Sequence, residues 1–205
     1  RNVPSLWQLW VYHPRDGDIV LQSLPRGELV DAIEGVTRSP WSHCGMVVHE
    51  NHCWWVVESI GHVRRTLLPL WIIRGRHGRF EAYRPTAVLP PGDETLHRVL
   101  DHYMGRPYDY HYAPGASEIY CSELIFDAFR DAYGVQLGEW QRLGDLNWKP
   151  YERLIKWTEQ GWVPLDRRII HPSGRTQGQF RQRVYPANLA CAERRRRTTT
   201  APEAT

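Results

Sequence analysis

The sequence is poor in cysteine and has no long apolar run. Four of its 205 residues are cysteine, Cys44, Cys53, Cys121 and Cys191, and their spacing is not that of a small disulfide-stapled domain. The longest apolar run, residues 67–73, contains a proline and is much shorter than the about 20 residues that a transmembrane helix requires. We therefore predict neither a disulfide framework nor a transmembrane segment.

A strong charge of one sign is also missing. The 26 basic and 23 acidic residues leave a net charge of +3, and no basic strip is interleaved with aromatic side chains. This pattern argues against a nucleic-acid partner. The chain is long enough for one domain with a buried core, to which ten tryptophans and ten tyrosines add apolar surface. We place this domain at residues 1–189 and interpret the polar residues 190–205 as a disordered tail.

One stretch, residues 117–129, has the pattern of an amphipathic helix with a cysteine at its start. Its apolar residues recur at helical spacing, at Leu124, Ile125, Ala128, Phe129 and Ala132. Gly134 follows the run, as is typical of a helix end. Cys121 stands at the N-terminal end, where free N–H groups and the helix dipole favour a thiolate. This position suits a nucleophile, although a small buried core cysteine is the alternative.

A second stretch, residues 42–58, reads as two β-strands around a polar tip. We predict a hairpin with a two-residue turn at Glu50-Asn51, since asparagine tolerates a positive φ. In this register His43 faces Glu58, with their Cβ atoms about 5 Å apart. Gly45 lies two residues from His43 on the same face and leaves room for a close approach.

The remaining segments predict an α+β fold. Strands are expected at residues 19–24, 62–66, 79–84, 168–170 and 182–185, and helices at 29–36, 96–104 and 150–158, with a helical turn at 67–74. We expect an antiparallel β-sheet that carries His43 and Glu58, packed against a small helical bundle that presents Cys121.

Five short motifs occur in an informative order. They are Asp16-Gly17-Asp18-Ile19-Val20, Ser42-His43-x-Gly45, Val57-Glu58-Ser59, Pro107-Tyr108-Asp109 and Tyr120-Cys121-Ser122-Glu123-Leu124. In this order they resemble the circularly permuted papain-like cysteine hydrolases of the NlpC superfamily, the YiiX/YaeF-like branch. The histidine strand precedes the cysteine helix, as in the permuted branch. The resemblance covers roughly residues 11–185.

The resemblance implies a role for each motif residue. Cys121 is the nucleophile, His43 the base and Glu58 the group that orients the histidine ring. Tyr108 corresponds to a tyrosine that helps to hold the oxyanion in NlpC-type relatives. No metal or cofactor is implied. Cys44 departs from the pattern, because an aliphatic residue is expected after the histidine. We expect Cys44 to point to the opposite face and to be inert.

The implied activity is hydrolysis through an acyl-thioester on Cys121. Relatives divide between amide bonds, as in cell-wall peptides, and acyl esters of lipids, as in the lecithin retinol acyltransferase-like branch. We expect an amide or peptide substrate, with the lipid acyl-ester hydrolase or acyltransferase as the alternative. The partner is therefore a small-molecule, peptide or lipid substrate.

Two further alternatives use the same residues differently. The hairpin carries five residues of zinc-ligand type, His43, Cys44, His49, His52 and Cys53. Strand alternation places the three histidines on one face and the two cysteines on the other, which works against a four-ligand site. The second alternative is a non-catalytic binding module on the same fold. The mark of such a module is a broken catalytic trio, and the trio is intact here. Taken singly, each residue has a commoner role: a hydrogen-bonded core histidine for His43, a strand end facing water for Glu58 and packing for Tyr108.

Overall fold

The structure is a computed structural model that describes residues 11–85, 94–113, 115, 117–171 and 180–185. Its main feature is a six-stranded antiparallel sheet in the order β4-β3-β2-β1-β5-β8. The strands are β1 Ile19–Gln22, β2 His43–Glu50, β3 Cys53–Ile60, β4 His62–Leu67, β5 Phe80–Pro85 and β8 Phe180–Tyr185. The predicted α+β class and antiparallel sheet are confirmed.

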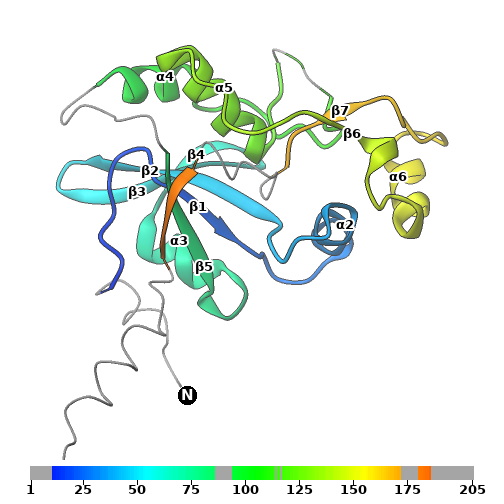
Figure 1. Ribbon diagram of the computed structural model, residues 1–205, viewed down its shortest axis with the longest axis horizontal. Coiled ribbons are helices and arrows are strands. Elements are labelled where there is room, and N and C mark those ends of the chain that lie inside the picture. The colour runs from blue at the N-terminus through cyan, green and yellow to red at the C-terminus, as the bar shows by residue number, and fades with distance from the viewer. Residues whose placement is uncertain (1–10, 86–93, 114, 116, 172–179, 186–205) are drawn as a thin grey trace, which may run out of the picture.

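Helices cover both faces of this sheet (Figure 1). The α-helices are α2 Glu28–Thr37, α3 Leu68–Arg74, α4 Thr95–Tyr103, α5 Cys121–Tyr133 and α6 Glu152–Thr158. Helices α4 and α5 pack on one face, and α3 packs on the other. A two-stranded sheet of β6 Gln141–Arg142 and β7 Arg168–Ile169 lies near α6 (Figure 1). Three short 3-10 helices complete the fold, at Arg76–Gly78, Leu143–Asp145 and Lys149–Tyr151.

Successive side chains of β2 point to opposite faces of the sheet, so the strand contributes to the core on both faces. Cys44, Met46 and Val48 join the core under α4 and α5. Val47 joins the core with α3 on the other face. The central strand is therefore buried on both sides, and a polar residue on it must find its partners within the protein.

The turn of the β2–β3 hairpin lies one residue later than we predicted. Asn51 and His52 form it, with φ values of 50° and 61°, and Glu50 pairs with Cys53. A tight turn of this kind needs positive φ at both central residues, and the predicted turn placed a glutamate at the first of them. The register is consequently shifted by two residues, and Met46, not Cys44, pairs with Val57. A shift of two keeps every side chain on its predicted face.

The cysteine helix has the predicted ends. Helix α5 begins at Cys121, after Tyr120 in an extended conformation, and Gly134 closes it with φ of 67°. No helix among the described residues has the length and apolar character required to cross a membrane. The predicted tail at 190–205, Cys191 and the N-terminal ten residues lie outside the described residues.

Candidate functional site

The fold brings His43, Glu58 and Cys121 together at the end of the sheet where α5 begins. His43 is the first residue of β2, and Glu58 lies in β3. The predicted direct pairing of His43 with Glu58 is wrong, because the two-residue shift places Gly45 opposite Glu58 and His43 diagonally across from it on the same face. All three residues are buried, with 2%, 0% and 3% of their surfaces exposed. The His43 Nε2 atom lies 2.6 Å from Glu58 Oε2, which leaves Nδ1 of the ring for the sulfur. The imidazole therefore stands between a carboxylate and a thiol.

Glu58 is held by donors from α3 and β4. The Trp71 indole N–H donates to Oε2 at 2.9 Å, and the Thr66 hydroxyl donates to Oε1 at 2.6 Å. The Arg74 guanidinium donates to both carboxylate oxygens. Burial opposes the charge of Glu58, but the hydrogen bonds from His43 and Arg74 outweigh burial and lower the pKa of the carboxyl well below its usual range. Glu58 is thus a fixed anion behind the ring.

His43 is a buried histidine that stays charged. Burial favours the neutral ring, but hydrogen bonds to Cys121 and Glu58 outweigh it and raise the pKa of His43 to about 9. The Trp71 ring lies next to the imidazole, with 6.3 Å between the ring centroids. At neutral pH the ring is therefore an imidazolium.

The pKa of Cys121 is shifted in the opposite direction, downward. A hydrogen bond with Cys44 is the largest influence and lowers the pKa of the Cys121 thiol, whereas burial raises it; the hydrogen bond and charge of His43 lower it further. The net pKa is well below the ordinary thiol value. The position at the start of α5 acts in the same direction, since backbone N–H groups there favour an anion. Cys121 and His43 together form a thiolate–imidazolium pair.

The predicted face of Cys44 is confirmed, and its inertness stays a prediction. Cys44 does lie on the opposite face of β2 from His43, as alternation requires, but this is the face that α5 covers. Cys44 therefore shares a buried cluster with Cys121. Burial, and next the contact with Cys121, raise the pKa of Cys44 well above its usual value. Alternation alone predicts the face of Cys44, whereas the position of α5 over that face depends on contacts between distant elements.

Tyr108 lies close enough to the thiol to feel its charge. It is 8% exposed, and its hydroxyl lies 3.1 Å from that of Tyr112, a residue that the sequence did not single out. Burial is the main reason why the pKa values of both hydroxyls are raised, and the charge of Cys121 adds to it. Backbone hydrogen bonds from Tyr108 to Gly61 and from Ile119 to Pro107 fix this loop beside α5. Two neutral hydroxyls are therefore held near the sulfur.

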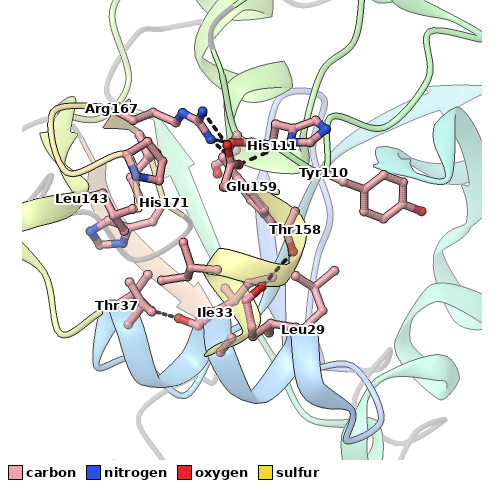
Figure 2. Close-up of a pocket in the computed structure, with 18 of the residues that line it drawn as sticks. Leu29, Ile33, Thr37, Tyr110, His111, Leu143, Thr158, Glu159, Arg167 and His171 are labelled. Atoms are coloured by element: carbon pink, nitrogen blue, oxygen red, sulfur yellow. Dashed lines mark hydrogen bonds and ion pairs between the residues drawn. The ribbon is translucent and has the colours of Figure 1, made fainter. Parts of the chain in front are cut away.

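A pocket of about 120 Å³ reaches Cys121 from the side of α2 and α6. Its wall is largely apolar and includes Leu29, Ala32, Ile33, Val36, Leu143, Leu154, Ile155, Ile169 and Ile170. Figure 2 shows polar side chains gathered at one place in the pocket, where Glu159 meets Arg167 and His111. The Glu159 Oε2 atom accepts a hydrogen bond from Arg167 Nη2 at 2.8 Å. Cys121 thus lies in the wall of a largely apolar pocket that also carries one charged cluster.

The zinc-ligand residues of the hairpin do not gather. His52 and Cys53 are exposed at the tip, and the His49 ring packs on Trp54 with centroids 4.6 Å apart. Within the described part of the chain, no group of three or more His, Cys, Asp or Glu side chains is placed to hold a metal ion. The described residues therefore do not fit the zinc alternative.

Two comparisons with known proteins agree with this fold. The chain is 30% identical over 175 residues to the uncharacterized protein YiiX of Escherichia coli K12, covering 83% of this chain and 84% of the relative. The crystal structure of YiiX from Escherichia coli O157:H7, described as a metalloprotein, superposes with a TM-score of 0.74 at 29% identity. That match covers 78% of this chain and 91% of the solved one.

A family description matches the sequence over residues 13–198. The family is that of the permuted papain-like amidase enzymes, YaeF/YiiX, C92. The match spans the sheet, the hairpin with His43 and Glu58, and the helix that starts at Cys121. With the histidine strand ahead of the cysteine helix, and with a fold shared with YiiX, this chain belongs to the permuted papain-like amidase family YaeF/YiiX.

Proposed function

We propose that the protein is a cysteine hydrolase that cleaves amide bonds through an acyl-thioester on Cys121. The observation that carries this proposal is the buried His43–Glu58 pair beside a thiol of lowered pKa at a helix N-terminus. A thiolate, a proton carrier and an orienting carboxylate are the parts that acyl transfer requires. The amidase description of the family supports the same reaction class.

In the proposed reaction the Cys121 thiolate attacks the amide carbonyl carbon. The oxyanion that develops is bound by the backbone N–H of Cys121 and by the Tyr108 hydroxyl, which is neutral because its pKa is raised. The His43 imidazolium then gives its proton to the departing nitrogen, the C–N bond breaks, and the acyl-thioester remains. His43, now neutral, takes a proton from water, which attacks the thioester and releases the acid. Glu58 keeps the ring oriented throughout.

The apolar pocket supports an aliphatic acyl group on the substrate. Its wall offers Leu, Ile, Val and Ala side chains, and most of the surface that it exposes is apolar. Burial of methylene groups in such a wall is favourable by about 0.8 kcal/mol each, and the charged side chains of the wall, Glu159, Arg167 and His111, are paired with one another. We therefore propose an N-acyl amide with an apolar acyl chain. The lipid acyl-ester alternative shares this acyl group and differs only in the atom that leaves.

An experiment with paired substrates separates these alternatives. Amides and esters of one fluorescent leaving group are prepared with acyl chains from acetyl to dodecanoyl, and kcat/KM is measured for each. We expect amide turnover that rises with chain length. Turnover of the esters alone would support the lipid-esterase alternative. No turnover of any compound, with the pocket open to iodoacetamide, would support the non-catalytic module and contradict the proposal.

A matched pair of variants tests the pocket. Ile155→Trp fills the pocket wall, whereas Ile73→Trp makes the same change on α3, where the side chain is 55% exposed. We expect Ile155→Trp to lose activity on long acyl chains and to keep it on the acetyl substrate, and Ile73→Trp to match the wild type. Equal losses on all chain lengths in Ile155→Trp would show that the pocket does not hold the acyl group.

A further inference from the structure

Serine and threonine hydroxyl groups line the same pocket as Cys121, and one of them differs from the others in its hydrogen bonds. They belong to Thr37, Ser42, Ser122 and Thr158. The hydroxyls of Thr37 and Thr158 donate to the backbone carbonyl oxygen four residues earlier in their own helices, at 2.7 and 3.1 Å (Figure 2). The Ser122 hydroxyl donates to the carbonyl oxygen of Ile170 at 2.9 Å. Three of the hydroxyl protons are therefore already bound to the backbone.

Ser42 is the exception, because its hydroxyl oxygen accepts a hydrogen bond. The Leu24 backbone N–H donates to Ser42 Oγ at 3.0 Å, and none of the described residues accepts the Ser42 hydroxyl proton. A hydroxyl has one proton and two lone pairs, so the bond from Leu24 leaves its donor unused. Only 2% of Ser42 is exposed. The pocket thus contains a buried O–H group that has no acceptor within the described part of the chain.

The backbone places Ser42 next to the reacting groups. It directly precedes His43 in the Ser42-His43-x-Gly45 motif. The Ser42 N–H donates to the Gln22 carbonyl oxygen at 3.2 Å and so extends the pairing of β1 with β2. Alternation then puts the Ser42 side chain on the face of Cys44, which is the face that α5 covers. Ser42 therefore enters the pocket from the sheet, and Cys121 enters it from the helix.

We propose that the Ser42 hydroxyl donates a hydrogen bond to the carbonyl oxygen of the substrate, as a further substrate-binding residue of this site. The inference rests on the proposed function, since it names a contact of the N-acyl amide. A buried hydroxyl proton without an acceptor is costly, and an amide with an apolar acyl chain brings one strong acceptor, its carbonyl oxygen. Negative charge grows on this oxygen during attack, so the hydrogen bond is strongest in the transition state.

A purely structural role of Ser42 makes a different prediction. If the hydroxyl only accepts the Leu24 N–H, its removal lowers stability and slows every substrate by the same factor. If its proton reaches the substrate, the loss depends on the acceptor atom of the substrate. A thioamide has sulfur, a weaker acceptor, in place of the carbonyl oxygen. The ratio of amide to thioamide turnover therefore reports the hydrogen bond, and it does not depend on how much of a variant is folded.

The test measures kcat/KM for the dodecanoyl amide and for the corresponding thioamide. We expect Ser42→Ala to lower kcat/KM for the amide by about 10²-fold, mainly through kcat. The amide-to-thioamide ratio should fall by about tenfold, the size of one hydrogen bond. Ser42→Cys keeps a side-chain acceptor for Leu24 and is a weaker donor, so its ratio should be intermediate.

Matched controls come from the hydroxyls that are already bound. Ser122→Ala and Thr158→Val each remove a pocket hydroxyl whose proton goes to the backbone, and both should keep the wild-type ratio. The pH midpoint of Cys121 alkylation by iodoacetamide, which reports the charge of the thiol, should be unchanged in Ser42→Ala. This result would separate a lost contact with the substrate from a damaged nucleophile.

The outcomes separate this inference from the proposed function. A wild-type ratio in Ser42→Ala, or a loss on the amide equal to that in Ser122→Ala, would overturn the role of Ser42 and leave the proposed function intact. Turnover of esters alone would move the same comparison to the ester and its thionoester, whose carbonyl oxygen and sulfur differ in the same way. No turnover of either class by the wild type would overturn the proposed function, and this inference with it.

Discussion

Both ends of the β2–β3 hairpin carry histidine and cysteine, but these side chains are exposed at one end and buried at the other. The tip carries His49, His52 and Cys53, all exposed. The base carries His43 and Cys44, both buried, with Glu58 beside them. At the base, α3 packs on one face and α5 on the other. At the tip the same imidazoles and thiol face solvent.

This difference shows that burial with partners, rather than residue type, makes the site. At the tip, water solvates the exposed histidine side chains. At the base, solvent is excluded, electrostatic interactions are stronger, and each polar group depends on a few fixed partners. A substitution at the base can therefore be compared with the same substitution at an exposed residue near the tip.

The largest effect is expected at the nucleophile. Cys121→Ala removes the atom that forms the acyl-thioester, so kcat/KM should fall by about 10⁴-fold or more, to the background rate. Cys53→Ala changes the same side chain at the exposed tip and should keep full activity. Initial rates on the best N-acyl amide measure both. Substantial activity in Cys121→Ala would assign the chemistry to another residue.

The histidines give the second comparison. His43→Ala removes the proton carrier, and we expect kcat to fall by about 10²–10⁴-fold, with a higher alkylation midpoint for Cys121. His49→Ala at the tip should change neither quantity, since its ring only packs on Trp54. Similar effects of the two substitutions would contradict the distinction between base and tip.

The carboxylates give the third comparison, in stability as well as in activity. Glu58→Gln leaves the Arg74 charge without its buried partner, so we expect a loss of about 3–5 kcal/mol in the free energy of unfolding. Glu50→Gln breaks a partly exposed ion pair with Arg65 at 3.0 Å and should cost about 1 kcal/mol or less. Urea denaturation measures both, and equal losses would show that the base is not specially paired.

The smallest effect is expected from a single donor to Glu58. Trp71→Phe removes the indole N–H that donates to Oε2, and we expect a loss of about 2 kcal/mol in stability, with a modest fall in kcat as the His43 ring loosens. Trp157→Phe, at a side chain that is 80% exposed, is the control and should have no effect. A larger loss in kcat than in Glu58→Gln would show that Trp71 acts in another way.

The sequence was sufficient to predict the faces of the hairpin because side-chain alternation has a period of two. The turn was misplaced by one residue and the pairing shifted by two, yet His43 and Glu58 stayed on a common face. The start of α5 at Cys121 and its end at Gly134 were also predictable, from apolar spacing and a glycine. Each of these features depends on a pattern within one short stretch of sequence, so it can be predicted without knowing the fold.

The partners of the site were not predictable, because they arise from contacts between distant elements. Arg74 and Trp71 lie in a run whose sequence predicts only a helical turn, and nothing local indicates that they reach Glu58. The burial of Cys44 in one cluster with Cys121 depends on which face of the sheet α5 covers. The apolar pocket needs α2 and α6, which are far apart in sequence, to converge near Cys121.

The most direct test of the central claim is the titration of the His43 ring, followed by NMR of protein labelled with ¹⁵N-histidine. Because the folded pKa is about 9, above the ordinary 6.5, the ring should keep its proton through the neutral range and lose it only as the pH rises through about 9. In Cys121→Ala the midpoint should fall, since the thiolate partner is gone. A wild-type ring that titrates at or below pH 6.5 would contradict the thiolate–imidazolium pair.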